Sequence, residues 1–368
     1  MSGDAWRVVD TGLRPAAENM ALDRALLEAR QAGESPNTLR FLQFEPAALV
    51  GYHQDVAREL HLDYCAAQGI AVQRRITGGG AIYFDPAQLG WELFLDRHGL
   101  GTADMAAVAA RICTAAAAGL RALGVAARFR PRNDIEVDGR KISGTGGVFD
   151  GDALMYQGTL LIDFDVEKML RVLRIPAEKL TRRAIASARE RVVNLRELLG
   201  SLPPLDDIKA ALTTAFAEAF GVDMAPAQLN DYEQRRYRAA LAELDTREWV
   251  YQPERVYPAQ TTLQGMHRCD GGLIYANVVF EPAARLLRQV WFHGDFFVSP
   301  RRLVADMEAA LRNTPLAHLR ATLAGCFAAQ AAHGIGLGAD DFAAAVENAV
   351  ADAPAPAAPS RGEASHAD

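Results

Sequence analysis

Cysteine is scarce in this sequence, and the four cysteines lie far apart. Cys65, Cys113, Cys269 and Cys326 form neither a CxxC pair nor a cluster with histidine. The pattern therefore indicates neither a zinc site nor a disulfide framework. We expect each thiol to pack as a small buried apolar side chain.

Long apolar runs and an excess of positive charge are also missing. No apolar run reaches the roughly 18 residues that a membrane-spanning helix needs, and the N-terminus lacks the basic-then-apolar pattern of a secretory signal. The formal net charge of -7 argues against broad electrostatic binding to nucleic acid or to anionic membranes, but it allows a local basic pocket. We expect a cytoplasmic protein.

The chain does have length and apolar content. Its 368 residues, 50% of them hydrophobic, exceed the size of about 250–300 residues at which single cores stop growing, so two domains are predicted. Strand-like and helical segments come in blocks without a regular βαβ repeat. This arrangement favours the α+β class, with a mixed or antiparallel sheet flanked by helices.

The composition and the apolar spacing also predict where the domains lie. We expect a first domain over residues 1–246 and a small α+β module over residues 247–345. Alternating apolar residues between 260 and 297 indicate a three-strand meander in this module, with two helices after it. Residues 350–368 are mainly Ala, Pro, Ser, Glu and Asp, which is typical of a disordered tail.

A glycine triplet follows two arginines in the first domain. Arg74 and Arg75 precede Gly78, Gly79 and Gly80, and bare glycine backbone beside fixed positive charge suits an anion. A glycine turn with a solvated arginine pair is the alternative. The triplet lies between two expected strands and opens no helix, so it is not a Rossmann or P-loop arrangement.

A second polar stretch surrounds a predicted hairpin. The Asp138-Gly139 dipeptide is a strong hairpin signal, and it places Lys141 just after the turn and shortly before Gly144. Most lysines at such positions are solvated, and Asp134 could equally be a turn residue. His53 follows another expected strand, where a ligand contact and a plain surface or packing role both remain open.

Cations and bare glycine backbone of this kind suit the binding of a phosphate or a carboxylate. A site that binds both anions suits a reaction that joins them. Activation of a carboxylic acid by ATP requires that two anions be held in contact. Lys141 would neutralise the charge that builds up, and Asp134 would hold a Mg²⁺ ion on the phosphate. From the residues alone, both this hypothesis and the structural alternatives remain open.

Several motifs, in this order, resemble those of lipoate-protein ligases. The resemblance covers roughly residues 5–340, including a C-terminal module similar to the ligases' accessory domain. The motifs are Arg74-Arg75-x-x-Gly78-Gly79-Gly80-Ala81, Asn133-Asp134-Ile135, Gly139-Arg140-Lys141-Ile142-Ser143-Gly144, Gly158-Thr159-Leu160-Leu161, Arg189-x-Arg191-Val192-x-Asn194-Leu195 and Gly294-Asp295-Phe296-Phe297.

The resemblance implies a biotin/lipoate-ligase-like catalytic domain that uses ATP and Mg²⁺ to convert lipoate to lipoyl-AMP. The lipoyl group would then pass to a lysine of a lipoyl-accepting carrier protein. It implies that Lys141 contacts the lipoyl carboxylate and the phosphate, and that the Asn133-Asp134 pair lies at the nucleotide. The glycine triplet and Ala81, with Gly144, Gly158 and Thr159, would line the acyl-adenylate. Arg74 and the 51–54 corner, with His53, would border the dithiolane and the aliphatic chain.

Three departures from the family pattern keep alternatives open. Phe84 and Gln157 stand where the family often has histidine, and Asn133 lies in the segment where related octanoyltransferases carry a nucleophilic cysteine. A cysteine-independent or divergent octanoyltransferase of the same fold, and a non-catalytic lipoate or acyl-protein binding module, are the two alternatives. A biotin ligase would interleave arginines within its glycine loop, whereas here both arginines precede the triplet.

Overall fold

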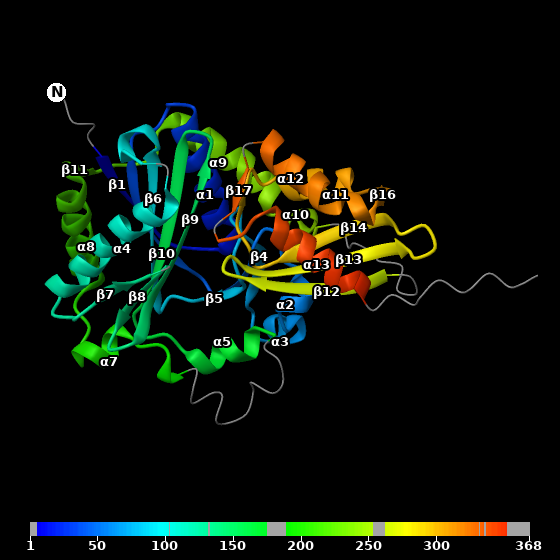
Figure 1. The fold of residues 1–368 in the computed structure, drawn as a ribbon. Coiled ribbons are helices and arrows are strands. Elements are labelled where there is room, and N and C mark those ends of the chain that lie inside the picture. The colour runs from blue at the N-terminus through cyan, green and yellow to red at the C-terminus, as the bar shows by residue number, and fades with distance from the viewer. Residues whose placement is uncertain are drawn as a thin grey trace, which may run out of the picture. The chain divides into compact units, whose positions relative to one another are not determined.

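The structure, a computed structural model, describes residues 6–102, 104–131, 133–174, 189–252, 262–330, 332–334 and 336–351. The chain forms two compact units, Met1–Glu254 and Arg255–Asp368. Figure 1 shows the helices and strands of both units.

The first unit is built on an eight-stranded sheet with the strand order β11-β1-β2-β6-β10-β9-β8-β7. β1 pairs in parallel with β2 and with β11, and the pairs from β2 to β7 are antiparallel. This mixed sheet confirms the predicted fold class. Its strands are β1 (Trp6–Arg14), β2 (Thr38–Phe44), β6 (Gln88–Asp96), β7 (Arg128–Arg130), β8 (Asp134–Val137), β9 (Arg140–Asp150), β10 (Ala153–Leu161) and β11 (Met224–Pro226).

Helices α4 (Met105–Ala122) and α8 (Leu205–Phe220) cover one face of this sheet. A methyl group on Gly119 of α4 would lie 3.0 Å from the Leu212 Cα of α8, so the two helices pack closely. With its 18 residues α4 is long and apolar enough to span a membrane, which the sequence analysis missed. Half of it is buried inside the unit, as in the core helix of a globular domain.

Helices α1 (Ala16–Gln31) and α9 (Asp231–Leu244) cover the opposite face. The strands alternate between the two cores, as the period of two requires. On β6, for example, Leu93 and Leu95 pack on the α4 side, whereas Phe94 packs on the α1 side. Adjacent residues of these strands therefore face opposite sides of the sheet.

A second, three-stranded sheet has the order β4-β3-β5. Its strands are β3 (Ala47–Val50), β4 (Ala71–Arg74) and β5 (Ile82–Phe84). Short helices complete this region of the unit, and several of their apolar side chains pack against the small sheet. They are α2 (Val56–Glu59), α3 (Leu62–Ala67) and α5 (Val166–Val172). A further short helix, α10 (Arg247–Tyr251), bonds to β4, whereas η1 (His98–Leu100) and α7 (Leu195–Leu199) lie elsewhere in the unit.

The second unit contains the predicted meander. β12 (Thr262–Cys269), β13 (Gly272–Glu281) and β14 (Leu286–Gly294) pair antiparallel in that order. Three helices share an apolar core with the sheet, namely α11 (Leu303–Ala310), α12 (Leu319–Ala329) and α13 (Ala339–Ala351). Shorter elements complete the unit: β15 (Val298–Ser299), β16 (Thr314–Pro315), η3 (Leu316–His318) and β17 (His333–Gly334).

The domain limits in the structure differ from those that the composition predicts. The first unit extends beyond residue 246 to Glu254, because α10 is tied to it by hydrogen bonds from the Arg74 guanidinium. The second unit extends past residue 345, because α13 is part of its core. Of the predicted disordered tail, residues 350–368, the first two belong to α13, and the residues from 352 onward lie outside the described residues.

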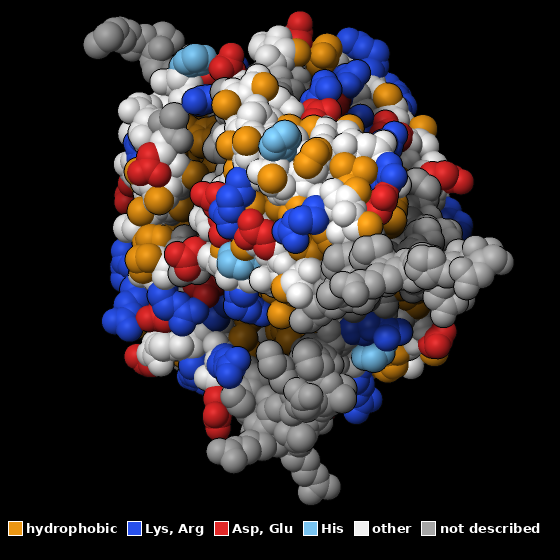
Figure 2. Space-filling view, turned by 45° about the vertical axis from the view of Figure 1, so that its right-hand side comes forward, with side chains coloured by type: hydrophobic (Ala, Val, Ile, Leu, Met, Phe, Trp, Pro, Cys, Tyr) orange, Lys and Arg blue, Asp and Glu red, His pale blue; other side chains and the backbone are white. Residues whose placement is uncertain are grey.

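The face of the molecule drawn in Figure 2 carries charges of both signs. Basic and acidic side chains are interspersed with apolar ones there, and the coloured residues in this view form no wholly basic face. This distribution agrees with the net charge of -7.

Candidate active site

The glycine triplet lies in the loop that joins β4 to β5. These two strands flank β3, so the loop passes over the end of β3, where Gly51 begins the 51–54 corner. A methyl group on Gly51 would lie 2.0 Å from the Gly79 carbonyl oxygen. Gly79 itself has φ 93°, which favours glycine. The structure therefore brings the triplet and the corner together, with their backbones in direct contact.

Arg75 supports the triplet loop from within the protein. Its guanidinium donates hydrogen bonds to the carbonyl oxygens of Leu49 at 3.2 Å, Gly78 at 3.1 Å and Gly80 at 2.8 Å. Burial lowers the pKa of Arg75 to about 10, and the nearby Asp23 carboxylate opposes this shift. The side chain therefore uses its donors to hold the shape of the loop.

Arg74 is also buried, at 1% exposure. It connects β4 with the 51–54 corner and with α10. His53 of this corner is partly exposed and lies edge-on to Tyr52, with ring centroids 4.9 Å apart. The Arg74 guanidinium donates at 2.7–3.2 Å to five backbone carbonyls, those of Gly51, Tyr52, Gln54, Trp249 and Val250.

The β8–β9 hairpin forms as the Asp138-Gly139 signal predicts. Both turn residues have positive φ, 50° and 79°. The Lys141 Nζ lies 2.8 Å from the Asp134 Oδ1, and its side chain remains 38% exposed. A methyl group on Gly144 would lie 2.6 Å from the Lys141 Nζ. The lysine therefore extends over bare glycine backbone, held there by one carboxylate.

The Arg-rich segment before α7 anchors the lysine's backbone. The Lys141 amide donates to the Arg191 carbonyl at 2.8 Å, and the Val193 amide donates to the Lys141 carbonyl at 2.9 Å. Of the motif that begins at Arg189, Arg191 and Val193 therefore bond to the hairpin, whereas Arg189 pairs with Glu167 of α5 and the Asn194 side chain bonds to the Phe164 backbone. Residues 185–188 of this segment lie outside the described residues.

Asn133 is fixed by Thr145, a residue that the sequence analysis did not single out. The Asn133 carbonyl accepts from the Thr145 amide and from its hydroxyl, each at 2.9 Å, and the Asn133 side-chain amide donates to the Thr145 carbonyl at 3.0 Å. Behind Thr145 lie Cys113 and Tyr156. No sequence motif marks these partners, because they come from α4, β9 and β10.

Gly158 and Thr159 lie on opposite faces of β10. A methyl group on Gly158 would lie 2.1 Å from the Trp91 ring, so this glycine makes room for the indole. Thr159 pairs in register with Gly144 on β9 and with Gly90 on β6. Thr159 therefore belongs to a row of small residues that starts next to Lys141.

A buried charged cluster occupies the neighbouring row on the α1 side of the sheet. The Arg40 guanidinium lies 2.5 Å from the Asp23 carboxylate and 2.9 Å from that of Glu92. Burial raises the pKa of both carboxyl groups, and the proximity of Asp23 raises the pKa of Glu92 further. Gln157 pairs in register with Glu92. No sequence motif marks this cluster, because its members come from three separate elements.

Two predicted positions that follow the glycine triplet in the chain, Ala81 and Phe84, are apolar. Phe84 is buried and stacks on Phe44 with ring centroids 4.5 Å apart. Ala81 is partly buried and packs against the core around the small sheet. Phe84 therefore contributes packing at the position where the resemblance led us to expect histidine.

The described residues contain no preformed metal centre, because no three His, Cys, Asp or Glu side chains among them gather closely enough to hold an ion. Asp134, the candidate Mg²⁺ ligand, is ion-paired with Lys141 and with Arg130. A single paired carboxylate does not fit a site built by protein ligands alone.

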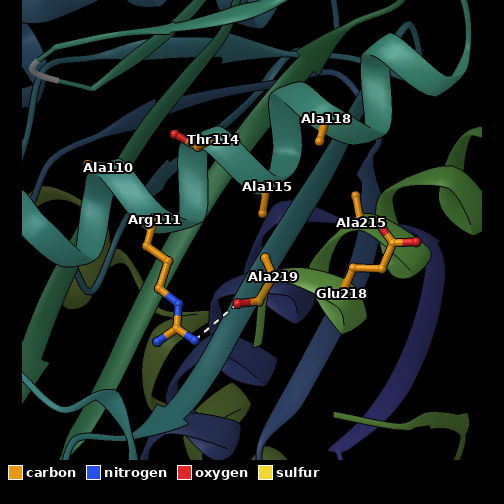
Figure 3. Close-up of a pocket in the computed structure, with 8 residues that line it drawn as sticks. All are labelled: Ala110, Arg111, Thr114, Ala115, Ala118, Ala215, Glu218 and Ala219. Atoms are coloured by element: carbon orange, nitrogen blue, oxygen red, sulfur yellow. Dashed lines mark hydrogen bonds between the residues drawn. The ribbon is translucent and has the colours of Figure 1, made fainter. Parts of the chain in front are cut away.

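An open groove of about 540 Å³ lies between α4 and α8, away from these residues (Figure 3). The Arg111 side chain crosses it and donates to the Ala219 carbonyl at 3.0 Å. None of the predicted site residues lines this groove. Its lining residues are Ala110, Arg111, Thr114, Ala115, Ala118, Ala215, Glu218 and Ala219.

Known proteins similar to this chain carry two kinds of name. The octanoyltransferase LipM of Moorella thermoacetica is 27% identical over 270 residues, which are 68% of this chain and 99% of that protein. The lipoate-protein ligase A subunit 1 of Thermoplasma acidophilum is 28% identical over 242 residues, 63% of this chain and 90% of that protein. The relatives therefore match the first unit in length.

Solved structures of lipoate-protein ligases are also similar to this chain. The bi-partite lipoate protein ligase of T. acidophilum, studied with its E2 lipoyl domain, has a TM-score of 0.62 at 26% identity and covers 69% of this chain and 100% of its own. A lipoate-protein ligase A bound with ATP has a TM-score of 0.60 at 25% identity, covering 67% of this chain and 98% of its own. P. falciparum LipL1 in complex with lipoate, at 16% identity, shares the fold over 88% of this chain and 94% of its own, with a TM-score of 0.69.

The family model of the lipoyl protein ligase A/B catalytic domain matches residues 15–217. That range includes the triplet, the hairpin and the β10 motif. The chain therefore belongs to the lipoyl protein ligase A/B family.

Proposed function

We propose that this protein is a cytoplasmic, ATP-dependent lipoate-protein ligase. It would convert free lipoate to lipoyl-AMP and then transfer the lipoyl group to a lysine of a lipoyl-accepting carrier protein. The observation that carries the proposal is the position of Lys141, a partly exposed ammonium group held over the bare backbone of Gly144 by Asp134.

The alternative is transfer of an octanoyl group from acyl carrier protein, and the names of relatives such as that of M. thermoacetica favour it. That route, as expected from the resemblance, needs a nucleophilic cysteine near the hairpin. Asn133 stands in that segment, and Cys113, which lies closest, is 0% exposed with its pKa raised by burial. A thiol that is buried and protonated is a poor nucleophile.

The second unit also supports the ligase. The M. thermoacetica protein is matched over 99% of its own length but over only 68% of this chain. The surplus corresponds in size to the unit that spans Arg255–Asp368. The Thermoplasma ligase is described as bi-partite, so a ligase with a second part is consistent with the organisation of this chain.

In the adenylation step a lipoate carboxylate oxygen attacks the α-phosphorus of ATP, forms a C–O–P anhydride and expels pyrophosphate. Both reactants are anions, so a fixed cation between them lowers the repulsion and stabilises the transition state. Lys141 would supply that cation, exchanging its ion pair with Asp134 for contacts to the two reacting groups. The triplet and Gly144 let the acyl-adenylate approach the backbone closely.

In the transfer step the acceptor lysine amine attacks the acyl carbon and AMP leaves, giving an amide. The same cation would then stabilise the departing phosphate. The acceptor is proposed to be a lipoyl domain, because the Thermoplasma ligase was studied together with its E2 lipoyl domain.

The test compares two acyl donors on the purified full-length protein. With free lipoate and ATP we expect pyrophosphate release and a retained lipoyl-adenylate, followed by modification of a lipoyl domain. With octanoyl-loaded acyl carrier protein and no ATP we expect no transfer. The octanoyltransferase would be the correct function if octanoyl-loaded acyl carrier protein supports transfer and mass spectrometry of the intact protein detects an octanoyl-cysteine. That adduct should be absent from the Cys113→Ala variant. Binding of lipoate without reaction from either donor would indicate a non-catalytic module.

A further inference from the structure

A buried chain of hydrogen bonds runs from α4 through β10 and β9 to Asn133. The Cys113 Sγ lies 3.3 Å from both the Tyr156 Oη and the Thr145 Oγ1, and the two hydroxyl oxygens lie 2.8 Å apart. Cys113 and Tyr156 are fully buried, and Thr145 is 9% exposed. Neither the proposed chemistry nor the family motifs use these three side chains.

The direction of this chain follows from counting hydrogens. A carbonyl oxygen can only accept, so the Thr145 hydroxyl donates its one hydrogen to the Asn133 carbonyl. Tyr156 must then donate to Thr145, and the Cys113 thiol, 3.3 Å from both hydroxyl oxygens, donates to one of them. Burial raises the pKa of Cys113 and of Tyr156, so both remain protonated donors. The Tyr156 and Thr145 hydroxyls therefore act in series, end on one backbone carbonyl and are backed by the thiol.

This chain of hydrogen bonds affects the positions of Asn133 and Asp134. Aligned donors in a buried environment polarise one another and strengthen the final bond. That bond and the Thr145 amide fix the Asn133 carbonyl, and Asp134, the partner of Lys141, is the next residue. A shift at Asn133 would move both residues that the nucleotide is expected to meet.

We propose that Thr145 is a positioning residue for nucleotide binding, which orients Asn133 and the start of β8 through the hydroxyl that Tyr156 and Cys113 support. The inference rests on the proposed function, because it takes the nucleotide to lie at Asn133 and Asp134. Thr145 touches neither substrate. It acts through Asn133, and it affects affinity for ATP more than affinity for the acid.

The test uses Thr145→Val, which keeps the branched shape and removes the hydroxyl, and Thr145→Ser, which keeps the hydroxyl. We expect Thr145→Val to weaken ATP binding and raise the KM for ATP about two- to tenfold, with the KM for lipoate unchanged. Thr145→Ser should restore ATP affinity. Tyr156→Phe should give a smaller effect, because Thr145 can still donate to Asn133. Thr213→Val is the matched control, since that hydroxyl donates to the Lys209 carbonyl within α8.

Amide hydrogen exchange over residues 133–147 provides a readout without substrates. Thr145→Val should speed exchange there, whereas Thr213→Val should not. If the wild type forms adenylate and Thr145→Val matches it in both ATP affinity and exchange, the inference is wrong and the ligase proposal stands. Equal losses for ATP and lipoate without rescue by Thr145→Ser also overturn it, because they indicate a general structural role. If the wild type binds no ATP, the ligase proposal fails. Faster exchange in Thr145→Val would then still show that Thr145 positions Asn133, but the proposed role in nucleotide binding would be wrong.

Discussion

At the end of β4 and the start of the loop after it, the Arg74 and Arg75 side chains are buried, whereas in the β8–β9 hairpin the Lys141 side chain stays 38% exposed. Arg75 donates to three backbone carbonyls and Arg74 to five. Lys141 has one charged partner at 2.8 Å, Asp134. Both regions place a cation beside glycine, yet only the hairpin cation can exchange its partner for a substrate anion at low cost.

The difference lies in what each guanidinium or ammonium group would lose on binding an anion. A buried arginine that turned to a ligand would leave carbonyl oxygens unpaired, at a cost of about 1–3 kcal/mol for each. An exposed lysine exchanges one carboxylate for another anion in partly solvated surroundings. Burial and competition from backbone carbonyls therefore separate scaffold cations from reactive ones.

The largest expected effect is the loss of adenylation in Lys141→Ala. Removal of a preorganised cation from a transition state of this kind should lower kcat about 10²–10³-fold, with little change in thermal stability because the side chain is partly exposed. Pyrophosphate release under saturating lipoate and ATP measures the change. Near-normal adenylation in the variant would show that Lys141 is a solvated hairpin lysine.

Arg75→Ala should act on stability instead. Without the guanidinium, the carbonyls of Leu49, Gly78 and Gly80 lose a buried donor. We expect a loss of about 3 kcal/mol in the free energy of unfolding, measured by chemical denaturation. Arg111→Ala is the control, because that exposed side chain donates to a single carbonyl. Equal losses in both variants would remove the distinction between scaffold and surface arginines.

The sequence predicted the parts of this comparison that depend on local pattern. The Asp138-Gly139 turn, the strands on both sides of the triplet and the meander of the second unit all form as expected. Turn residues and period-two alternation act over a few positions, so they can be read from the chain directly.

What the sequence did not reveal depends on residues far apart in the chain. Asp23, Arg40 and Glu92 meet only when α1 packs on β2 and β6, and Cys113 reaches Thr145 only through the packing of α4. The roles of the two arginines were equally hidden, because a sequence shows charge but not burial. The helix α13 was missed because its alanine-rich composition resembles that of the tail after it.

Glycine substitutions sharpen the comparison between the two loops. At Gly144 a methyl group meets the flexible end of Lys141, whereas at Gly51 it meets the Gly79 carbonyl of the backbone. Gly144→Ala should therefore lower adenylation about tenfold by displacing the ammonium and leave stability nearly unchanged. Gly51→Ala should cost about 2 kcal/mol of stability.

Gly99→Ala serves as the control for both variants, because a methyl group there meets nothing within 4 Å. Activity assays and thermal melts of the three proteins separate the two effects. A Gly144→Ala protein that lost stability but kept its activity per folded molecule would contradict the assignment of the hairpin as the reactive loop.

The smallest expected effect concerns the pH dependence that the buried cluster imposes. Glu92 has a pKa raised above its ordinary value of 4.5, so the folded protein keeps a proton that the unfolded chain releases. This contribution to stability is complete below about pH 4.5 and declines as the pH rises toward the raised pKa. Glu92→Gln cannot ionise and should flatten this decline, making the variant about 1 kcal/mol more stable than the wild type at pH 8. Urea unfolding at several pH values measures the difference. If the two proteins keep parallel profiles from pH 5 to pH 8, Glu92 is ionised in the folded state and Arg40 compensates both carboxylates.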